Sequence, residues 1–444
     1  MNMSNRDWHD LTLREEEFMR KAGLFFILSL ALLGVGCSVL DMDLIKSKES
    51  FKLVNIDLDD HEVSTDAQRL VTDVNVFGID LFDQIYQENP EKNHLLSPLS
   101  AAIAMAMLEN GANGATRDEI IDALGVEVDV LNPSFNELMN IYGAIDEQSD
   151  ENRDYATIEN ANSLWVRPDL KAKEDYVDVL GKYYDAQFFS VNFKSKKTVD
   201  RMNQWVEERT NGLLKDTFKE FSKETVAALI NTLYFKGQWT DSFSEELTTK
   251  EDFQVSDAHT ETVDMMHKSL TAPYFETKTA QVAVLDYYGA RMLVFLPKGE
   301  VADMMTDSMV LEAITSNQNI DYHHQRLNVS MPKIDFEAKN DLKTLLMNLG
   351  VISVFDESAA DLSNMLASDK QVVVSKVYQN ARIKVDEHGT EAAAVTVMEI
   401  ELTSGPAEPE TPIDFNCDHP YMIVIQDSIT GTNLFMGVVN NPND

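Results

Sequence analysis

An alternating segment near the C-terminus constrains this chain more than any other feature. Residues 386–403 read DEHGTEAAAVTVMEIELT. Every second residue from Thr390 is small or apolar, whereas the other face carries Glu391, Glu399 and Glu401. This is the pattern of a strand with one buried face. The segment nevertheless ends in SGPAEPETP, a composition typical of an exposed loop. The pattern therefore predicts a loop that can become a strand.

The other signals mix helices and strands without regular alternation, which predicts an α+β domain. Helical spacing of apolar residues predicts a helix at Ala67–Tyr86, and Ser97 with Pro98 forms a cap for a second, buried helix. Thr116 and Glu119 have the spacing of a capping box. Strands are expected at Val226–Phe235, Ala280–Tyr287, Arg291–Leu296, Leu327–Met331, Val372–Val377, Met422–Gln426 and Leu434–Val439.

Several segments of the chain resemble the serpins, in the order of that family. The loop resembles the serpin hinge at Glu387, Gly389, Thr390, Glu391, Ala392, Ala393 and Ala394. The other matching segments are Leu95–Thr116, Ala161–Trp165, Met202–Asp216, Leu229–Trp239 and Asp418–Pro442. The resemblance implies the serpin fold, in which helices pack around a large mixed β-sheet with smaller sheets. It also implies an exposed reactive loop, at about residues 386–412, that inserts into the main sheet.

The same resemblance implies a suicide inhibitor of serine proteases that is cleaved in this loop and traps its target covalently. The family's spacing places the reactive bond between Thr403 and Ser404. A small residue before the bond suits elastase-like or subtilisin-like proteases. The neighbouring bond between Leu402 and Thr403 would instead favour chymotrypsin-like or papain-like enzymes, the latter being cysteine proteases.

Further positions match residues that the family uses to control insertion. Ser97, Ser100 and Asn231 resemble the polar cluster that governs opening of the main sheet. Gln379 stands where the family often has a histidine, and its amide can still donate and accept hydrogen bonds. Trp239 matches the point where the loop enters the sheet. Alternatively, Ser97 and Ser100 serve only in helix capping and packing.

The N-terminal residues predict export. Arg20 and Lys21 precede an apolar run, Ala22–Gly36, that suits the core of a signal peptide spanning residues 1–36. Cys37 follows LLGVG, which resembles a bacterial lipobox, and acylation there would anchor the protein in the bacterial cell envelope or at the cell surface. Ordinary secretion with an incidental cysteine is the alternative. The start at Met1 or Met19, and a periplasmic or outward orientation, stay open.

Residues 37–66 are predicted to be the acylated cysteine and a flexible acidic tether, because Ser38–Thr65 is charged and has no sustained period. The serpin domain is then expected at 67–444. The remaining cysteine, Cys417, lies in an apolar context and is expected to be a buried, inert thiol.

The charge of the chain argues against two kinds of polyanionic partner. Seventy-five acidic and 37 basic residues give a net charge of -38, and no cluster of Lys and Arg stands out, which argues against nucleic acid. The acidic stretch Glu127–Glu151 likewise argues against a heparin-like cofactor.

No GxSxG, HExxH, P-loop, CxxC pair or GxGxxG is present. We therefore expect no enzymatic activity, metal or cofactor. The protein is also expected to be a monomer. A lipid-anchored hydrolase is disfavoured for the same reason. The main alternative is a non-inhibitory serpin-fold binding protein that is merely cleaved as a substrate, and the small residues of the hinge argue against it.

Overall fold

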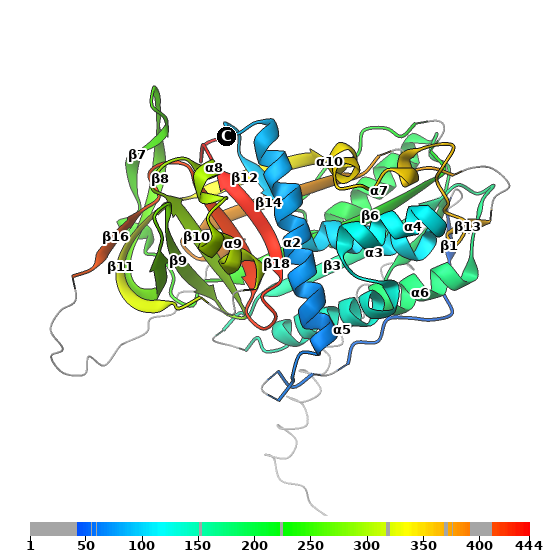
Figure 1. Cartoon of the computed structure of the whole chain (residues 1–444), viewed down its shortest axis with the longest axis horizontal. Coiled ribbons are helices and arrows are strands. Elements are labelled where there is room, and N and C mark those ends of the chain that lie inside the picture. Colours follow the sequence, from blue (N-terminus) through cyan, green and yellow to red (C-terminus); the bar gives the residue numbers. More distant parts are fainter. Residues whose placement is uncertain are drawn as a thin grey trace, which may run out of the picture. The chain divides into compact units, whose positions relative to one another are not determined.

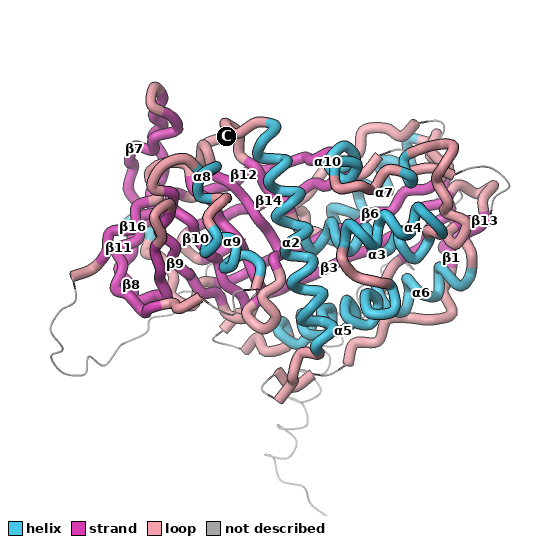
Figure 2. The backbone as a smooth tube through the Cα atoms, viewed as in Figure 1, coloured by secondary structure: helices cyan, strands magenta, loops and turns pink. Residues whose placement is uncertain are grey.

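The computed structural model describes residues 42–54, 56–58, 60–150, 153–222, 225–316, 320–367, 372–374, 376–390 and 411–444. Asp43–Asp444 form one compact unit. Its helices and strands are shown in Figure 1 and, by type, in Figure 2. No helix among the described residues is long and apolar enough to cross a bilayer.

The main sheet is mixed and contains the start of the predicted loop. Its strands β3 and β5 are parallel, and β15 runs antiparallel to both of its neighbours, β6 and β14. In spatial order its seven strands are β1 (Met42–Ile45), β5 (Gln187–Val191), β3 (Thr157–Val166), β6 (Ala227–Gln238), β15 (Gly389–Thr390), β14 (Tyr378–Asp386) and β12 (Ile334–Asp341).

A second, nine-stranded sheet is antiparallel except where β11 meets β16. Its order is β16 (Ile413–Asn416), β11 (His323–Pro332), β8 (His259–Glu276), β9 (Ala280–Tyr287), β10 (Ala290–Pro297), β17 (Tyr421–Asp427), β18 (Asn433–Val439) and β2 (His94–Leu96), with β7 (Thr249–Ser256) paired to β8. β4 (Lys171–Ala172) and β13 (Leu366–Ala367) form a separate pair.

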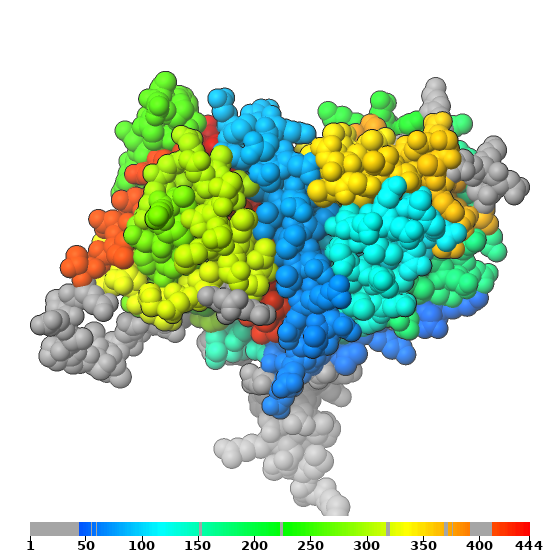
Figure 3. Space-filling model, in the orientation of Figure 1, coloured from blue at the N-terminus to red at the C-terminus, as the bar shows by residue number. Residues whose placement is uncertain are grey.

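Helices cover these sheets. They are α2 (Thr65–Glu88), α3 (Pro98–Gly111), α4 (Gly114–Leu124), α5 (Val128–Asp146), α6 (Glu174–Tyr184), α7 (Lys196–Arg209), α8 (Val301–Met304), α9 (Ser308–Thr315) and α10 (Leu342–Asn348), with short 3-10 turns η2 (Glu245–Leu247) and η3 (Ser353–Phe355). Figure 3 shows α2, in blue, running down the middle of the molecule. The predicted α+β architecture, with helices packed around a large mixed sheet, is thereby confirmed.

The predicted buried helix is α3, which packs against β6 and β18. Ser97 is its N-cap and accepts a hydrogen bond from the Ser100 N–H, and Pro98 is the first helical residue. Apolar residues on every side of it, among them Ala102, Ile103 and Ala106, are buried, because the helix lies between the sheets and its helical neighbours.

The predicted capping box at Thr116 and Glu119 is wrong. Helix α4 begins earlier, at Gly114, with Asn113 as its N-cap, so both residues lie inside the helix. The Glu119 carboxylate instead accepts hydrogen bonds from the backbone N–H groups of Ile352 and Ser353, at 2.8 and 2.6 Å. The Glu119 side chain therefore makes a long-range contact instead of the local capping bond that its spacing predicted.

The predicted strand at Val372–Val377 is also wrong in position. The described residues of that segment are not in a strand, and β14 begins at Tyr378. Apolar Val372, Val374 and Val377 pack against the core without joining a ladder. The apolar pattern correctly indicated burial but not strand pairing, because burial alone does not require a ladder.

Several described residues of the segment predicted to be a flexible tether contact the body of the domain. The Ser47 hydroxyl and the Lys48 N–H both donate to Asp178 Oδ1, at 3.1 and 2.7 Å, and Leu53 packs against Gly143 of α5. Ser64 caps α2 and donates to Glu137. These irregular contacts leave no periodic signature in the sequence, which explains why the segment resembled a tether.

Candidate functional site

The first residues of the predicted loop already lie in the main sheet. Gly389 pairs with Gln238 of β6 and Asp386 of β14, and Thr390 pairs with Gly237 and Val385. Gly389 has a φ of +150°, and a Cβ at this position would lie 2.0 Å from the Gly237 carbonyl oxygen. Only glycine can occupy this position without displacing β6.

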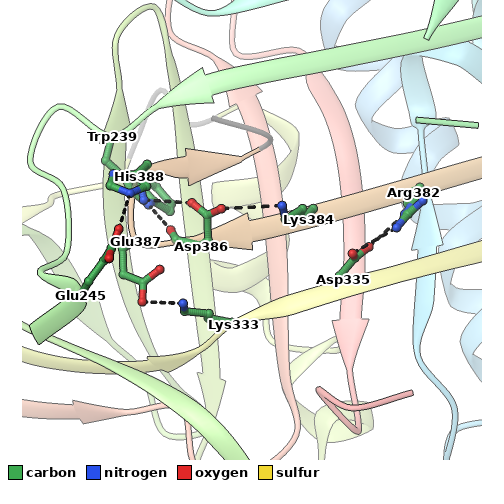
Figure 4. Close-up of polar contacts among 9 residues, drawn as sticks. All are labelled: Trp239, Glu245, Lys333, Asp335, Arg382, Lys384, Asp386, Glu387 and His388. Atoms are coloured by element: carbon green, nitrogen blue, oxygen red, sulfur yellow. Dashed lines mark hydrogen bonds and ion pairs between the residues drawn. The ribbon is translucent and has the colours of Figure 1, made fainter. Parts of the chain in front are cut away.

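Glu387 anchors the hinge just before it enters the sheet (Figure 4). Its carboxylate is almost fully buried, pairs with Lys333 Nζ at 2.6 Å and accepts a hydrogen bond from Thr248 Oγ1 at 2.7 Å. Burial acts to raise the pKa of Glu387, but the hydrogen bonds from Lys333 and Thr248 outweigh it and the pKa is lowered. Glu387 is therefore held as a charged, paired carboxylate.

Trp239 lies directly against the hinge, as the sequence placed it. Its indole Nε1–H donates to the Asp386 carbonyl oxygen at 3.0 Å, and its backbone N–H donates to the His388 carbonyl oxygen at 3.0 Å. Its ring stacks on Tyr287 with centroids 4.1 Å apart, and the Tyr287 hydroxyl is 2.7 Å from Thr390 Oγ1. His388 Nε2 lies 2.9 Å from Glu245 Oε1. With Lys333 and Thr248, the hinge is thus held by side chains from four other segments, at Trp239, residues 245–248, Tyr287 and Lys333.

The proposed sheet-opening residues form one connected network. Gln379 accepts a hydrogen bond from the Ser97 N–H and donates to the Ser97 carbonyl oxygen, both at 2.9 Å. The Ser100 hydroxyl donates to Asn231 Oδ1. Helix α3 is thereby connected to both β14 and β6, the two strands between which β15 lies. Both a role in sheet opening and the alternative of helix capping and packing are compatible with these bonds to β14 and β6.

Two asparagines of β3 extend this network, and the sequence did not single them out. Asn231 donates to Asn160 Oδ1 at 3.1 Å and to Asn162 Oδ1 at 2.6 Å, and Asn162 pairs with Asn231 across the ladder. Their spacing of two residues places them on one strand face, which is a signal that could have found them. Lys333, Thr248, Tyr287 and Glu245 were also missed, because each reaches the hinge from a distant segment.

Several predicted site residues lie outside the described part of the chain. They are the hinge residues Glu391, Ala392, Ala393 and Ala394, the reactive-bond residues Leu402, Thr403 and Ser404, and the lipidation residue Cys37. Cys417 is fully buried, and burial raises the pKa of its thiol well above the ordinary value, as expected for an inert thiol.

The fold and the hinge geometry define a class of protein in which the first residues of the predicted reactive loop already form a strand of the main sheet. A family model described as Serpin (serine protease inhibitor) matches residues 72–442. An uncharacterized serpin-like protein of Methanosarcina acetivorans is 31% identical over 94% of this chain and 97% of its own. Alpha-1-antiproteinase 2 of Equus caballus is 31% identical, over 82% of this chain and 85% of its own.

Among solved structures, human thyroxine-binding globulin in complex with thyroxine has a TM-score of 0.73 and 25% identity, and the match covers 85% of this chain and 100% of that one. This chain belongs to the serpin family. The family's general activity is protease inhibition and not catalysis, although it includes binding proteins such as that globulin.

Proposed function

We propose that this chain is a suicide inhibitor of serine proteases that works by inserting its cleaved loop into the main sheet. The observation that carries the proposal is the position of β15. Gly389 and Thr390 lie between β6 and β14, and no ladder among the described residues joins these two strands directly. The long facing edges of β6 and β14 can take up further residues of the loop.

The register of β15 predicts how far insertion would extend. Each further loop residue would pair one position earlier on β6, so Ile400 would be opposite Ala227, the first residue of that strand. Thr390, Ala392 and Ala394 would share one face, and Thr390 is already buried. Small side chains on that face suit a sheet that closes over them. The inserted strand would end three residues before Thr403.

The chemistry belongs to the target protease. Its serine oxygen attacks the Thr403 carbonyl carbon, the Thr403–Ser404 bond breaks, and the amine of Ser404 leaves with a proton from the protease's general acid. The resulting acyl-enzyme is then carried along as the freed loop inserts, before water can hydrolyse the ester. A small residue at Thr403 favours elastase-like or subtilisin-like targets, and cleavage after Leu402 would favour chymotrypsin-like or papain-like ones.

We also propose that the protein is exported and anchored by acylation of Cys37. The apolar run Ala22–Gly36 behind two basic residues, followed directly by a cysteine, supports this assignment. The protein would then act at the bacterial envelope or cell surface against proteases that reach it. Mass spectrometry of the envelope fraction tests this directly, since an acylated Cys37 at the mature N-terminus is expected.

The substitution Thr390→Arg tests insertion. The Thr390 side chain is buried and its hydroxyl lies 2.7 Å from that of Tyr287, so an arginine would place an unpaired charge in the closing sheet. We expect the variant to be cleaved as a substrate, with a stoichiometry of inhibition raised by an order of magnitude or more. Thr390→Ser keeps the hydroxyl and should inhibit normally. An unchanged stoichiometry in the arginine variant would refute insertion.

A further inference from the structure

The proposed path of the loop runs between β6 and β14, which β15 already separates at the hinge. Gly389 pairs with Gln238 of β6 on one side and with Asp386 of β14 on the other. Four residues farther from the hinge, the two strands carry Tyr234 and Arg382. Both would flank the same residue of a strand that continued the register of β15. Because paired residues of antiparallel strands share a face, the Tyr234 and Arg382 side chains lie on one face of the sheet.

A turn of defined shape follows helix α7. The Gly212 N–H donates to the Glu207 carbonyl oxygen at 2.8 Å and thereby ends the helix. The Leu213 N–H donates to the carbonyl oxygen of Thr210, a fully buried residue, also at 2.8 Å. Gly212 has a φ of +81°, a left-handed conformation that glycine adopts without strain. We call residues 211–213 the crossing turn.

The crossing turn contacts both strands that flank the path. The Asn211 side-chain amide donates to the Tyr234 hydroxyl of β6 at 3.3 Å. Arg382 Nη1 of β14 donates to the Leu213 carbonyl oxygen at 3.4 Å. The turn therefore crosses the path of the loop at the level of Tyr234 and Arg382. Arg382 and Leu213 are 169 positions apart in the sequence, so no local pattern reveals this contact.

Helix α7 is attached to the strands on the β6 side of the path. The Trp205 indole N–H donates to Gln187 Oε1 of β5 at 2.8 Å. The Trp205 ring lies edge-on to that of Trp165 of β3, with centroids 6.5 Å apart. Since β5, β3 and β6 are neighbours in the sheet, we expect α7 and the crossing turn to move with these three strands.

Arg382 is held by the strands on the other side of the path. Its Nε and Nη2 donate to the two carboxylate oxygens of Asp335 of β12, at 2.9 and 3.0 Å (Figure 4). Two parallel bonds of this kind fix the plane of a guanidinium group. The bond from Arg382 Nη1 to the Leu213 carbonyl oxygen therefore joins the β14–β12 side to the β6 side. We call this bond the latch.

We propose that Arg382 is a positioning residue for loop insertion, because the latch holds the crossing turn over the path of the loop. The proposal rests on the insertion mechanism proposed above and names a residue that controls its rate. A strand inserted at this level holds β6 and β14 two strand spacings apart, roughly 9.6 Å. The crossing turn follows β6, so this separation breaks the latch. The rate of that step, relative to hydrolysis of the acyl-enzyme, decides between trapping and release.

The rate of loop insertion tests the latch. Arg382→Met keeps a long side chain and removes the guanidinium, and we expect insertion to become about fivefold faster. The full chain is mixed with saturating elastase, and insertion is followed by stopped-flow tryptophan fluorescence, since the Trp239 indole donates to the hinge at Asp386. The second-order rate constant of loop cleavage should not change, because Arg382 is not part of the reactive loop.

Tyr234→Phe is the matched control. It removes the hydroxyl that accepts a bond from the same turn, but on the β6 side, so insertion should stay within about twofold of the wild-type rate. Equal insertion rates for Arg382→Met and the wild type would overturn the proposal. Equal acceleration by Tyr234→Phe would also overturn it, because any loosening of the turn would then be sufficient.

The heat resistance of the cleaved wild-type chain separates failure of the latch from failure of the inhibitor proposal. An inserted loop adds a strand to the main sheet, so the cleaved chain should resist heat better than the intact chain. A cleaved chain that gains no heat resistance would show that the loop does not insert, which removes both proposals. Gain of heat resistance at the same rate in the wild type and both variants would remove the latch alone.

Discussion

At the scale of single residues, Glu109 is an ionisable side chain buried in the hydrophobic core. It lies on α3, its side chain is fully buried, and Arg117 Nε is 3.7 Å from Oε1. Burial raises the pKa of Glu109 to about 7, against the opposing attraction of Arg117. The folded protein therefore holds a proton on this group that the unfolded chain releases near pH 4.5.

This raised pKa predicts a pH dependence of stability. Between its unfolded and folded pKa values the folded state binds more protons, so the contribution of Glu109 is present at low pH and is lost as the pH rises through about 7. We expect the free energy of unfolding of Glu109→Gln, relative to that of the wild type, to rise by roughly 2.5 kcal/mol between about pH 5 and pH 8. Urea unfolding at both pH values measures this. The same difference in free energy of unfolding between the two proteins at both pH values would contradict this prediction.

The reactive bond is the second prediction at this scale. If the bond follows Thr403, the substitution Thr403→Arg presents a basic residue to the specificity pocket of the target. We expect inhibition to shift from elastase-like toward trypsin-like proteases, measured as second-order rate constants against one enzyme of each class. Leu402→Arg, one residue earlier, is the matched control and should shift the targets less. A larger shift with Leu402→Arg would instead assign the reactive bond to Leu402–Thr403.

At the scale of secondary-structure elements, Gln379 connects β14 to helix α3. Gln379→Leu would leave the buried Ser97 N–H without a partner, whereas the Ser97 carbonyl would keep the hydrogen bond from the Ala101 N–H, so the expected cost is roughly 1–3 kcal/mol. The adjacent Tyr378→Leu changes a half-exposed side chain on the other face and should cost about 0.5 kcal/mol or less. Chemical unfolding of both variants measures the difference. Equal free energies of unfolding for the two variants would show that the bonds between Gln379 and Ser97 do not stabilise β14.

The elements also show what the sequence could and could not reveal. Strong local patterns predicted well: α2, β9 and β17 lie where apolar patterning placed them, within a few residues, and α3 begins at the cap that Ser97 and Pro98 predicted. Errors arose where long-range contacts decided the outcome, as when Glu119 bonds the turn at Ser353 instead of capping its own helix. The hinge partners Lys333 and Tyr287 carry no local signal, because pairing with Glu387 and Thr390 exists only in the folded sheet.

At the scale of the whole molecule, one sheet links the hinge and the sheet-opening network. β15 is held by both β6 and β14. Asn231 and Gln379 lie farther along these two strands, and Ser100 and Ser97 of α3 bond to them. Anything that moves β6 and β14 apart must break bonds of this network. Insertion of the loop would therefore be a cooperative change of the sheet and not a local movement of the hinge.

The most direct test of this account is the reaction of the full chain with a pancreatic-type elastase. The products are separated on a denaturing gel, and any released C-terminal peptide is identified by mass spectrometry. We predict a covalent complex that survives denaturant, together with a peptide that begins at Ser404. Complete cleavage without a stable complex, repeated with subtilisin, chymotrypsin and papain, would contradict the trapping mechanism and leave a serpin that proteases merely cut.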